Sequence, residues 1–217
     1  MNSTKSTTLK WMLLLTLSVS ILLVITGCGK KAETNELQLE SSDKHPVVTI
    51  EMSNDKVIKV ELFPEVAPNT VNNMISLVQA GFYDGKIFHR VIPKFMVQAG
   101  ELVAADAGQP DYTIKGEFAN NGFKNFLLHE RGVISTARVG GMNDSASTQF
   151  FIMVNKNAGL DGDYAAFGKV VEGIEVADEI AAQPRDGLDR PNKDPLYMKK
   201  VTVDLKGMTF PEPEVIR

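Results

Sequence analysis

One arginine and one glutamine stand among large apolar residues in the run from Phe88 to Gly100. Two short strand-like segments flank the Pro93-Lys94 turn, so a hairpin would bring the side chains of Arg90 and Gln98 together. A guanidinium stays charged at any relevant pH and carries several fixed N–H donors. Such a group beside an apolar surface can stabilise a localised lone pair, and we therefore expect a functional site here.

The same residues also have simpler explanations. Arg90 taken alone is more typical of a surface arginine in a salt bridge, and large apolar side chains more often form a core. Gln98 and Gln149 are equally well explained as side chains that hydrogen-bond a strand end. The residue types by themselves leave both readings open.

Other kinds of chemistry find little support in the chain. The three histidines, His45, His89 and His129, lie in unrelated contexts without ligand spacing, so we predict no metal and no cofactor. The serines lack a hydrolase elbow motif. With 23 Lys and Arg against 27 Asp and Glu, the formal net charge is −4 and no nucleic-acid partner is expected.

Several motifs beyond the first run share one resemblance. They are Ile134-Ser135-Thr136-Ala137, Ser147-Thr148-Gln149-Phe150-Phe151-Ile152, Leu160-Asp161-Gly162 and Phe167-Gly168-Lys169-Val170-Val171-Glu172-Gly173. In this order, from about Val47 to about Leu205, the chain resembles the cyclophilin-type peptidyl-prolyl cis-trans isomerases. The resemblance implies an isomerase that acts on proline-containing polypeptides.

By that resemblance Arg90 matches the catalytic arginine, Gln98 the glutamine that orients it, and Gln149 a second polar wall. The pocket for the proline ring would be formed by Phe95, Met96, Phe151 and Leu160, with Ala137 in the adjoining groove and Tyr164 able to stack on the peptide. Isomerisation breaks no covalent bond and only has to cross a rotational barrier of about 18 to 20 kcal/mol. A donor aimed at the prolyl nitrogen would stabilise the twisted amide more than either planar form.

The chain departs from the family pattern at three positions of this site. Gly159 stands where many members have tryptophan, Tyr164 where histidine is frequent, and Arg138 where asparagine is usual. The absent indole removes a donor and a wall, whereas Arg138 adds positive charge to the groove.

The N-terminus has the pattern of an exported lipoprotein. Lys5 and Lys10 precede the apolar run from Trp11 to Ile25, and the chain's single cysteine, Cys28, follows Gly27. We expect a signal peptide over 1–27 and a lipidated Cys28 with a flexible tether over 28–46, the alternative being an uncleaved membrane helix. A diacylated end would anchor the protein to the cell membrane on the extracytoplasmic side.

The remaining sequence predicts one mainly β domain over 47–207 and a loose C-terminal tail over 208–217. Strands are expected over 47–52, 56–62, 87–92, 95–99, 132–138, 148–154, 165–171 and 199–206. A helix capped by Asn69 or Thr70 should bury Val71, Met74, Ile75 and Val78 and end at Gly81, and a second should span 174–182, burying Ile174, Ala177, Ile180 and Ala181. Short strands favour closure, and the resemblance implies a closed eight-stranded antiparallel β-barrel capped by two short α-helices.

These expectations combine into a lipid-anchored prolyl isomerase that assists the folding of exported proteins. The alternative is a proline-peptide-binding chaperone or adaptor module with weak catalysis, which Gly159 favours. A purely structural lipoprotein is the third reading.

Overall fold

Alternating apolar residues build a single antiparallel sheet of eight strands. The structure is a computed structural model that describes residues 43–102 and 110–217. The chain divides into two units, Met1–Glu36 and Leu37–Arg217, and the described residues belong to the second. The expected signal peptide and Cys28 lie outside the described residues.

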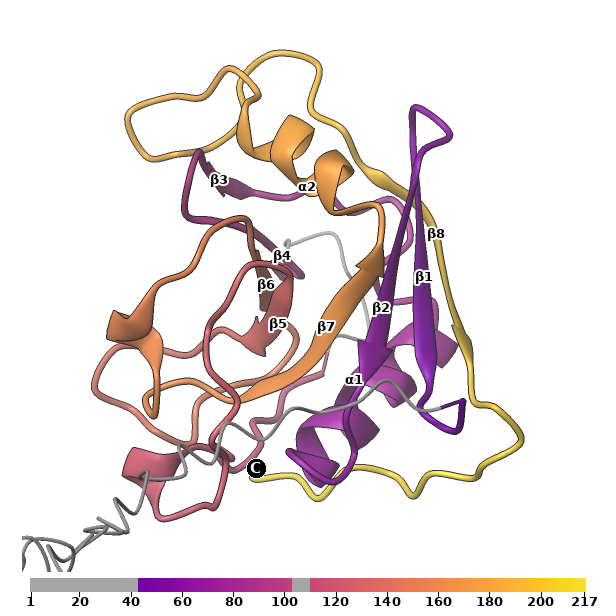
Figure 1. The fold of residues 1–217 in the computed structure, drawn as a ribbon, viewed down its shortest axis with the longest axis vertical. Coiled ribbons are helices and arrows are strands. Elements are labelled where there is room, and N and C mark those ends of the chain that lie inside the picture. The colour runs from indigo at the N-terminus through magenta and orange to yellow at the C-terminus, as the bar shows by residue number, and fades with distance from the viewer. Residues whose placement is uncertain (1–42, 103–109) are drawn as a thin grey trace, which may run out of the picture. The chain divides into compact units, whose positions relative to one another are not determined.

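The strands follow the sequence pattern closely, and all their pairings are antiparallel (Figure 1). Their order across the sheet is β3-β4-β6-β5-β7-β2-β1-β8. The bounds are β1 Val47–Met52, β2 Val57–Leu62, β3 Arg90–Ile92, β4 Met96–Ala99, β5 Val133–Thr136, β6 Phe150–Met153, β7 Ala166–Glu172 and β8 Met198–Asp204. The mainly β prediction is confirmed.

The sheet is curled and open where a closed barrel was expected. Within residues 43–102 and 110–217 no ladder joins the edge strands β3 and β8. Contact at this seam is limited to the segment before β3, where the Gly85 N–H donates to the Met198 carbonyl and the Met198 N–H donates to the Lys86 carbonyl. The Val91 N–H on β3 donates instead to the Asp189 carbonyl at 2.9 Å. The loop after α2 therefore takes the edge of β3 that a closing strand would need.

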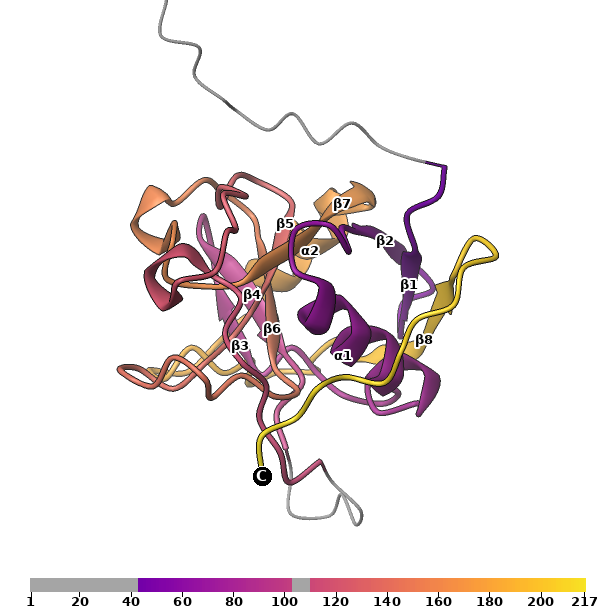
Figure 2. The same ribbon diagram turned by 90° about the horizontal axis from the view of Figure 1, so that it is seen from below.

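Two helices lie at opposite ends of the curled sheet, α1 over Pro68–Gln79 and α2 over Ile174–Ala181 (Figures 1 and 2). The apolar stripe predicted for α1 is buried as expected, and so are Ala177, Ile180 and Ala181 of α2, with Ile174 partly buried against the same core. Gly81, at φ +70°, follows the end of α1 as predicted.

The predicted start of α1 is wrong. The N-cap residue is Ala67, which makes no side-chain cap, and Pro68 opens the helix. The buried carboxylate of Glu117 caps it from a distant part of the chain, accepting the Asn69 N–H at 3.0 Å and the Thr70 N–H at 2.7 Å. Tertiary structure supplies the acceptor that local sequence would otherwise provide.

The two faces of the sheet carry two separate apolar clusters. The main core lies inside the curl and takes in both helices, together with residues such as Val97, Phe150 and Ile152. Successive side chains of a strand point to opposite faces. Their neighbours Met96, Phe151 and Met153 therefore belong to a second cluster on the other face.

Both ends of the domain are more ordered than the sequence suggests. His45 and Pro46, assigned to the tether, contact β2, since His45 Nδ1 lies 2.9 Å from Glu61 Oε1 and the Pro46 carbonyl accepts the Leu62 N–H. The C-terminal tail passes along α1 instead of hanging loose (Figure 2). Asn69 exchanges two hydrogen bonds with the backbone of Glu214, and Phe210 packs against the main core.

The described residues contain no helix that is both long and apolar enough to cross a membrane.

Candidate active site

The predicted hairpin sets the geometry of the site. β3 and β4 pair with Arg90 opposite Gln98, and β4 pairs with β6 so that Gln98 lies opposite Phe151. Directly opposed residues share a face. Arg90, Gln98 and Phe151 therefore form one row across three strands, on the face that carries the second cluster.

A line of polar side chains continues from the row. Gln98 Nε2 donates to Gln149 Oε1 at 2.7 Å. The Gln149 carbonyl accepts the Ala137 N–H at 2.9 Å. These bonds fix both glutamines beside Arg90 and leave little freedom in their orientation.

Arg90 is held loosely and faces solvent. Its side chain is 44% exposed, and its Nε lies 3.8 Å from Asp189 Oδ2, too far for a hydrogen bond. The other oxygen of Asp189 lies 3.2 Å from Arg185 Nε. An exposed ion pair of this length contributes little and leaves the guanidinium donors available to a ligand.

The second cluster brings the predicted apolar residues together. Met96 and Phe151 are buried in it, and Phe95, Ala137, Leu160 and Tyr164 pack against it partly exposed. The edge of the Tyr164 ring meets the Phe151 ring, with centroids 5.7 Å apart. The six apolar and aromatic residues predicted for the groove thus lie in one cluster, and Ala137 joins it to Gln149 through the backbone bond between them.

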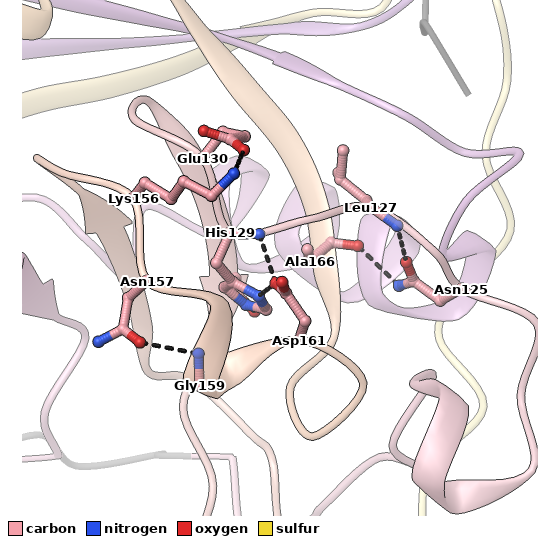
Figure 3. Close-up of polar contacts among 10 residues, drawn as sticks. Asn125, Leu127, His129, Glu130, Lys156, Asn157, Gly159, Asp161 and Ala166 are labelled. Atoms are coloured by element: carbon pink, nitrogen blue, oxygen red, sulfur yellow. Dashed lines mark hydrogen bonds and ion pairs between the residues drawn. The ribbon is translucent and has the colours of Figure 1, made fainter. Parts of the chain in front are cut away.

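Sequence reasoning missed the support behind this cluster. The buried ring of His129 stacks on Phe151 with centroids 5.9 Å apart and an interplanar angle of 18°. Its Nδ1 lies 3.0 Å from Asp161 Oδ1, the same oxygen that accepts the His129 N–H at 2.7 Å (Figure 3). Its Nε2 lies 3.2 Å from Ser135 Oγ. Asp161 follows Leu160, so these bonds fix the turn that carries Leu160 against Phe151.

The two histidines of the site are kept neutral by their surroundings. Burial lowers the pKa of His129, although the hydrogen bond and charge of Asp161 act in the opposite direction. Burial also lowers the pKa of His89, partly offset by the charge of Glu101. A neutral His129 that donates from Nδ1 to Asp161 has Nε2 free to accept from Ser135, which fixes its tautomer. The positive charge near the row therefore comes from arginine.

The rim of the cluster shows how the chain departs from its expected pattern. Gly159 is exposed in the 3₁₀ turn Ala158–Leu160, where its N–H donates to Asn157 Oδ1 at 2.9 Å (Figure 3). No ring covers Leu160 from that position. On the other side, Arg138 lies with its guanidinium carbon 4.9 Å from the centre of the Tyr164 ring.

Comparison with known proteins agrees with this architecture. Two crystallised cyclophilins have a similar structure. One is a cyclophilin type peptidyl-prolyl cis-trans isomerase of Cryptosporidium parvum, solved in the presence of the dipeptide Ala-Pro. Its TM-score is 0.63 at 26% sequence identity, and the match covers 73% of this chain and 98% of that one. The other, a cyclophilin from Hirschia baltica, has a TM-score of 0.61 at 26% identity over 74% of each chain. The fold is cyclophilin-like.

Comparison of the sequence with protein families and with related isomerases assigns the chain to a family. Residues 47–203 match the family model described as cyclophilin type peptidyl-prolyl cis-trans isomerase. Peptidyl-prolyl cis-trans isomerase A of Dickeya dadantii is 44% identical over 65% of this chain and 73% of its own length. Isomerase B of Bacillus subtilis is 43% identical over 57% of this chain and 82% of its own length. The chain belongs to the cyclophilin-type peptidyl-prolyl cis-trans isomerase family and is an enzyme of that class.

Proposed function

We propose that Arg90 is the catalytic donor of a lipid-anchored prolyl isomerase that acts on exported proteins. The observation that carries the catalytic part is the row in which Arg90 lies opposite Gln98 and beside the apolar cluster. A proline ring would pack on the exposed parts of Phe95 and Leu160, and its amide would then face the guanidinium.

The chemistry follows from what happens to an amide when it twists. Rotation about the X-Pro bond removes conjugation and localises a lone pair on the prolyl nitrogen. A guanidinium N–H directed at that nitrogen binds the twisted state more strongly than either planar isomer, which lowers the barrier. Gln98 acts on the reaction through Arg90 and Gln149 and needs no proton transfer of its own.

The test of the catalytic part is an isomerisation assay on proline tetrapeptides with the domain from residue 43 onward and its Arg90→Ala variant. We expect Arg90→Ala to lower kcat/KM by about 100-fold or more, in the range found for removal of one transition-state donor. The kcat/KM of Arg90→Lys should lie between those of the unaltered domain and Arg90→Ala, since lysine keeps the positive charge but lacks the planar set of guanidinium donors. Arg131→Gln, which removes a charge beside Asp178 on α2, is the matched control. Equal activity of the Arg90→Ala and unaltered domains would refute the assignment.

The cellular part of the proposal rests on the sequence of the first 28 residues, with its charged start, apolar run and single cysteine. Uncatalysed prolyl isomerisation takes tens to hundreds of seconds, which exposes a newly exported chain to proteolysis. An enzyme tethered to the outer side of the membrane would shorten that interval. Its substrates would be unfolded, proline-containing exported polypeptides.

Fractionation of cells tests the anchor. The full chain should sediment with membranes and release an acylated N-terminal peptide beginning at Cys28 on mass spectrometry. Cys28→Ala should abolish the acylation. If the unaltered chain carries no lipid on Cys28, the anchor is refuted while the isomerase assignment stands.

The alternative of a weakly catalytic binding module rests on Gly159. Peptide titration followed by NMR separates the two, since a module would bind proline peptides without accelerating exchange between their cis and trans signals.

A further inference from the structure

Arg138 carries a positive charge at the edge of the site and forms no ion pair with any carboxylate of residues 43–102 and 110–217. Arg131, Arg185 and Arg190 all pair with carboxylates. Within residues 43–102 and 110–217, the hydrogen bonds of Arg138 go to two backbone carbonyls, from Nε to Asp163 at 2.8 Å and from Nη1 to Val139 at 3.4 Å. Backbone carbonyls orient a guanidinium but carry no net charge.

The neighbouring carboxylates are turned toward other partners. Asp163 Oδ1 accepts a hydrogen bond from Asn120 Nδ2 at 2.8 Å. Asp144 accepts from the Gly116 N–H and from Asn121, and these bonds lower its pKa. The carboxylates of Asp163 and Asp144 are therefore hydrogen-bonded to other groups.

Two aromatic rings hold the guanidinium in place. Its central carbon lies 4.9 Å from the centre of the Tyr164 ring and 5.2 Å from that of Phe118. Phe118 is buried, so at least one of these rings is fixed by the fold. Cation–π contacts and the bond from Nε together fix an otherwise flexible side chain before any ligand arrives. In the described part of the chain no group accepts a hydrogen bond from Nη2, so its donors are available to a ligand.

The position of Arg138 relative to Arg90 follows from the sheet order. Arg90 lies on β3 and Ala137 directly follows β5, which is three strands away across β4 and β6. Ser135 is the residue of β5 that lies opposite Phe151, and Arg138 follows it by three residues. The separation of Arg138 from Arg90 therefore combines about 14 Å across the strands with about 10 Å along them, or roughly 17 Å. An extended peptide spans that distance in about five residues. Tyr164, on which Arg138 lies, also contacts Phe151 of the apolar cluster.

We propose that Arg138 is a specificity-determining residue that favours polypeptides with an acidic side chain within about five residues of the proline. A carboxylate matches this guanidinium best, because it carries the opposite charge and its oxygens can accept charge-assisted hydrogen bonds from the Nη2 donors. This inference rests on the proposed placement of the proline ring beside Arg90. It deepens that function by naming the class of substrate.

The experiment uses a set of peptides with one proline in an all-alanine background. In separate peptides a single glutamate is placed at each of the five positions before the proline and each of the five after it. A matching set carries lysine at the same positions. NMR measures two quantities for each peptide, the dissociation constant from titration and kcat/KM from cis-trans exchange. The enzymes are the domain from residue 43 onward, Arg138→Gln, Arg138→Glu and, as the matched loss of one charge, Arg131→Gln.

At low ionic strength we expect at least one glutamate peptide to bind about two- to five-fold more tightly than its alanine parent, the range for a partly exposed ion pair. The lysine peptide at that position should bind more weakly than the parent. The preference should shrink at 0.5 M salt, vanish in Arg138→Gln and reverse in Arg138→Glu. Arg131→Gln should retain it.

Two outcomes overturn the inference: no glutamate peptide exceeds its parent, or the preference survives in Arg138→Gln. Failure of the proposed function has a different signature, since the all-alanine parent would then show no accelerated exchange. Binding is measured separately, so the preference is decided in that case as well.

Discussion

At the scale of single residues, the site depends on which side chains surround Phe151. His129 supports one face of its ring, Gln98 lies opposite it across the strands, and Tyr164 meets it edge-on. Each of these neighbours holds a fixed orientation through its own contacts. A ligand that packs against this cluster therefore meets a surface arranged in advance, which limits the entropy lost on binding.

Gly159 leaves the site without the aromatic side chain that many family members have at this position, and a substitution can test what that side chain would add. A β-carbon there would meet only Asn157 Oδ1, at 3.0 Å, and that atom ends a flexible side chain. Gly159→Trp should place an indole over Leu160 and tighten binding of proline peptides by about three- to ten-fold, corresponding to roughly 1 kcal/mol for an added aromatic contact. Titration followed by NMR measures the change.

Gly159→Ala is the control for this change, because it adds the β-carbon without the ring. Its affinity should stay at that of the unaltered domain. If the tryptophan and alanine variants bind equally, the indole adds no wall to the site.

At the scale of elements, long-range contacts complete structures that the local sequence leaves unfinished. α1 begins without a capping side chain of its own, and Glu117 supplies the acceptor for two of its N–H groups. The negative charge also suits the positive end of the helix dipole. The segment around Glu117 and the start of α1 are therefore expected to lose structure together.

Removal of this cap gives a prediction for stability. Glu117→Ala should lower the free energy of unfolding by about 2 kcal/mol, because the buried Thr70 N–H and the partly buried Asn69 N–H lose their acceptor. Glu117→Gln should cost less, since its amide oxygen still accepts one bond. Urea denaturation measures both variants. A loss below about 0.5 kcal/mol for Glu117→Ala would show that water replaces the carboxylate without penalty.

At the scale of the whole molecule, the C-terminal segment acts as a strap over α1. Asn69 and Ser76 of the helix bond to Glu214 and Glu212, and Ile216 exchanges two backbone hydrogen bonds with Thr113. Phe210 adds apolar contact with the main core. The strap joins the end of the chain to elements formed by residues far earlier in the sequence.

Deletion of residues 208–217 should therefore lower the stability of the domain by about 1 to 3 kcal/mol, from the lost burial of Phe210 and the lost hydrogen bonds. Thermal and urea unfolding measure the loss. Phe210→Ala should reproduce part of it. An unchanged midpoint after the deletion would mean that the strap rests on the surface without stabilising it.

The buried histidines make the stability of the whole domain depend on pH. Burial lowers the pKa of His89 and of His129 below the 6.5 of an exposed histidine. The unfolded chain therefore binds more protons than the folded one as the pH falls through 6.5, and the domain loses stability in that direction. The contribution is fully present above pH 6.5, where both states are neutral.

Urea unfolding at pH 7.5 and at pH 5.5 tests this prediction. The free energy of unfolding should be smaller at pH 5.5, and His129→Gln should reduce the difference between the two conditions. Equal values for the unaltered domain at both pH values would contradict it.

Much of the fold could be predicted from the sequence because its signals are local. Alternation of apolar and polar residues located all eight strands to within a few residues, and the 3.6-residue periodicity located both helices and their buried stripes. The pairing of Arg90 with Gln98 followed from the short turn between β3 and β4. Such features depend on neighbours within a few residues of each other.

The features that only the tertiary structure decided depend on segments far apart in the chain. The sheet stays open because Asp189 takes the edge of β3, α1 is capped by Glu117, and the tail is held by Asn69. The stacking of the His129 ring on Phe151 likewise depends on residues that are distant in the sequence. A sequence shows which groups can donate, accept or pack, but the partner of a buried polar group is fixed only when distant strands meet, because burial leaves no water to take its place.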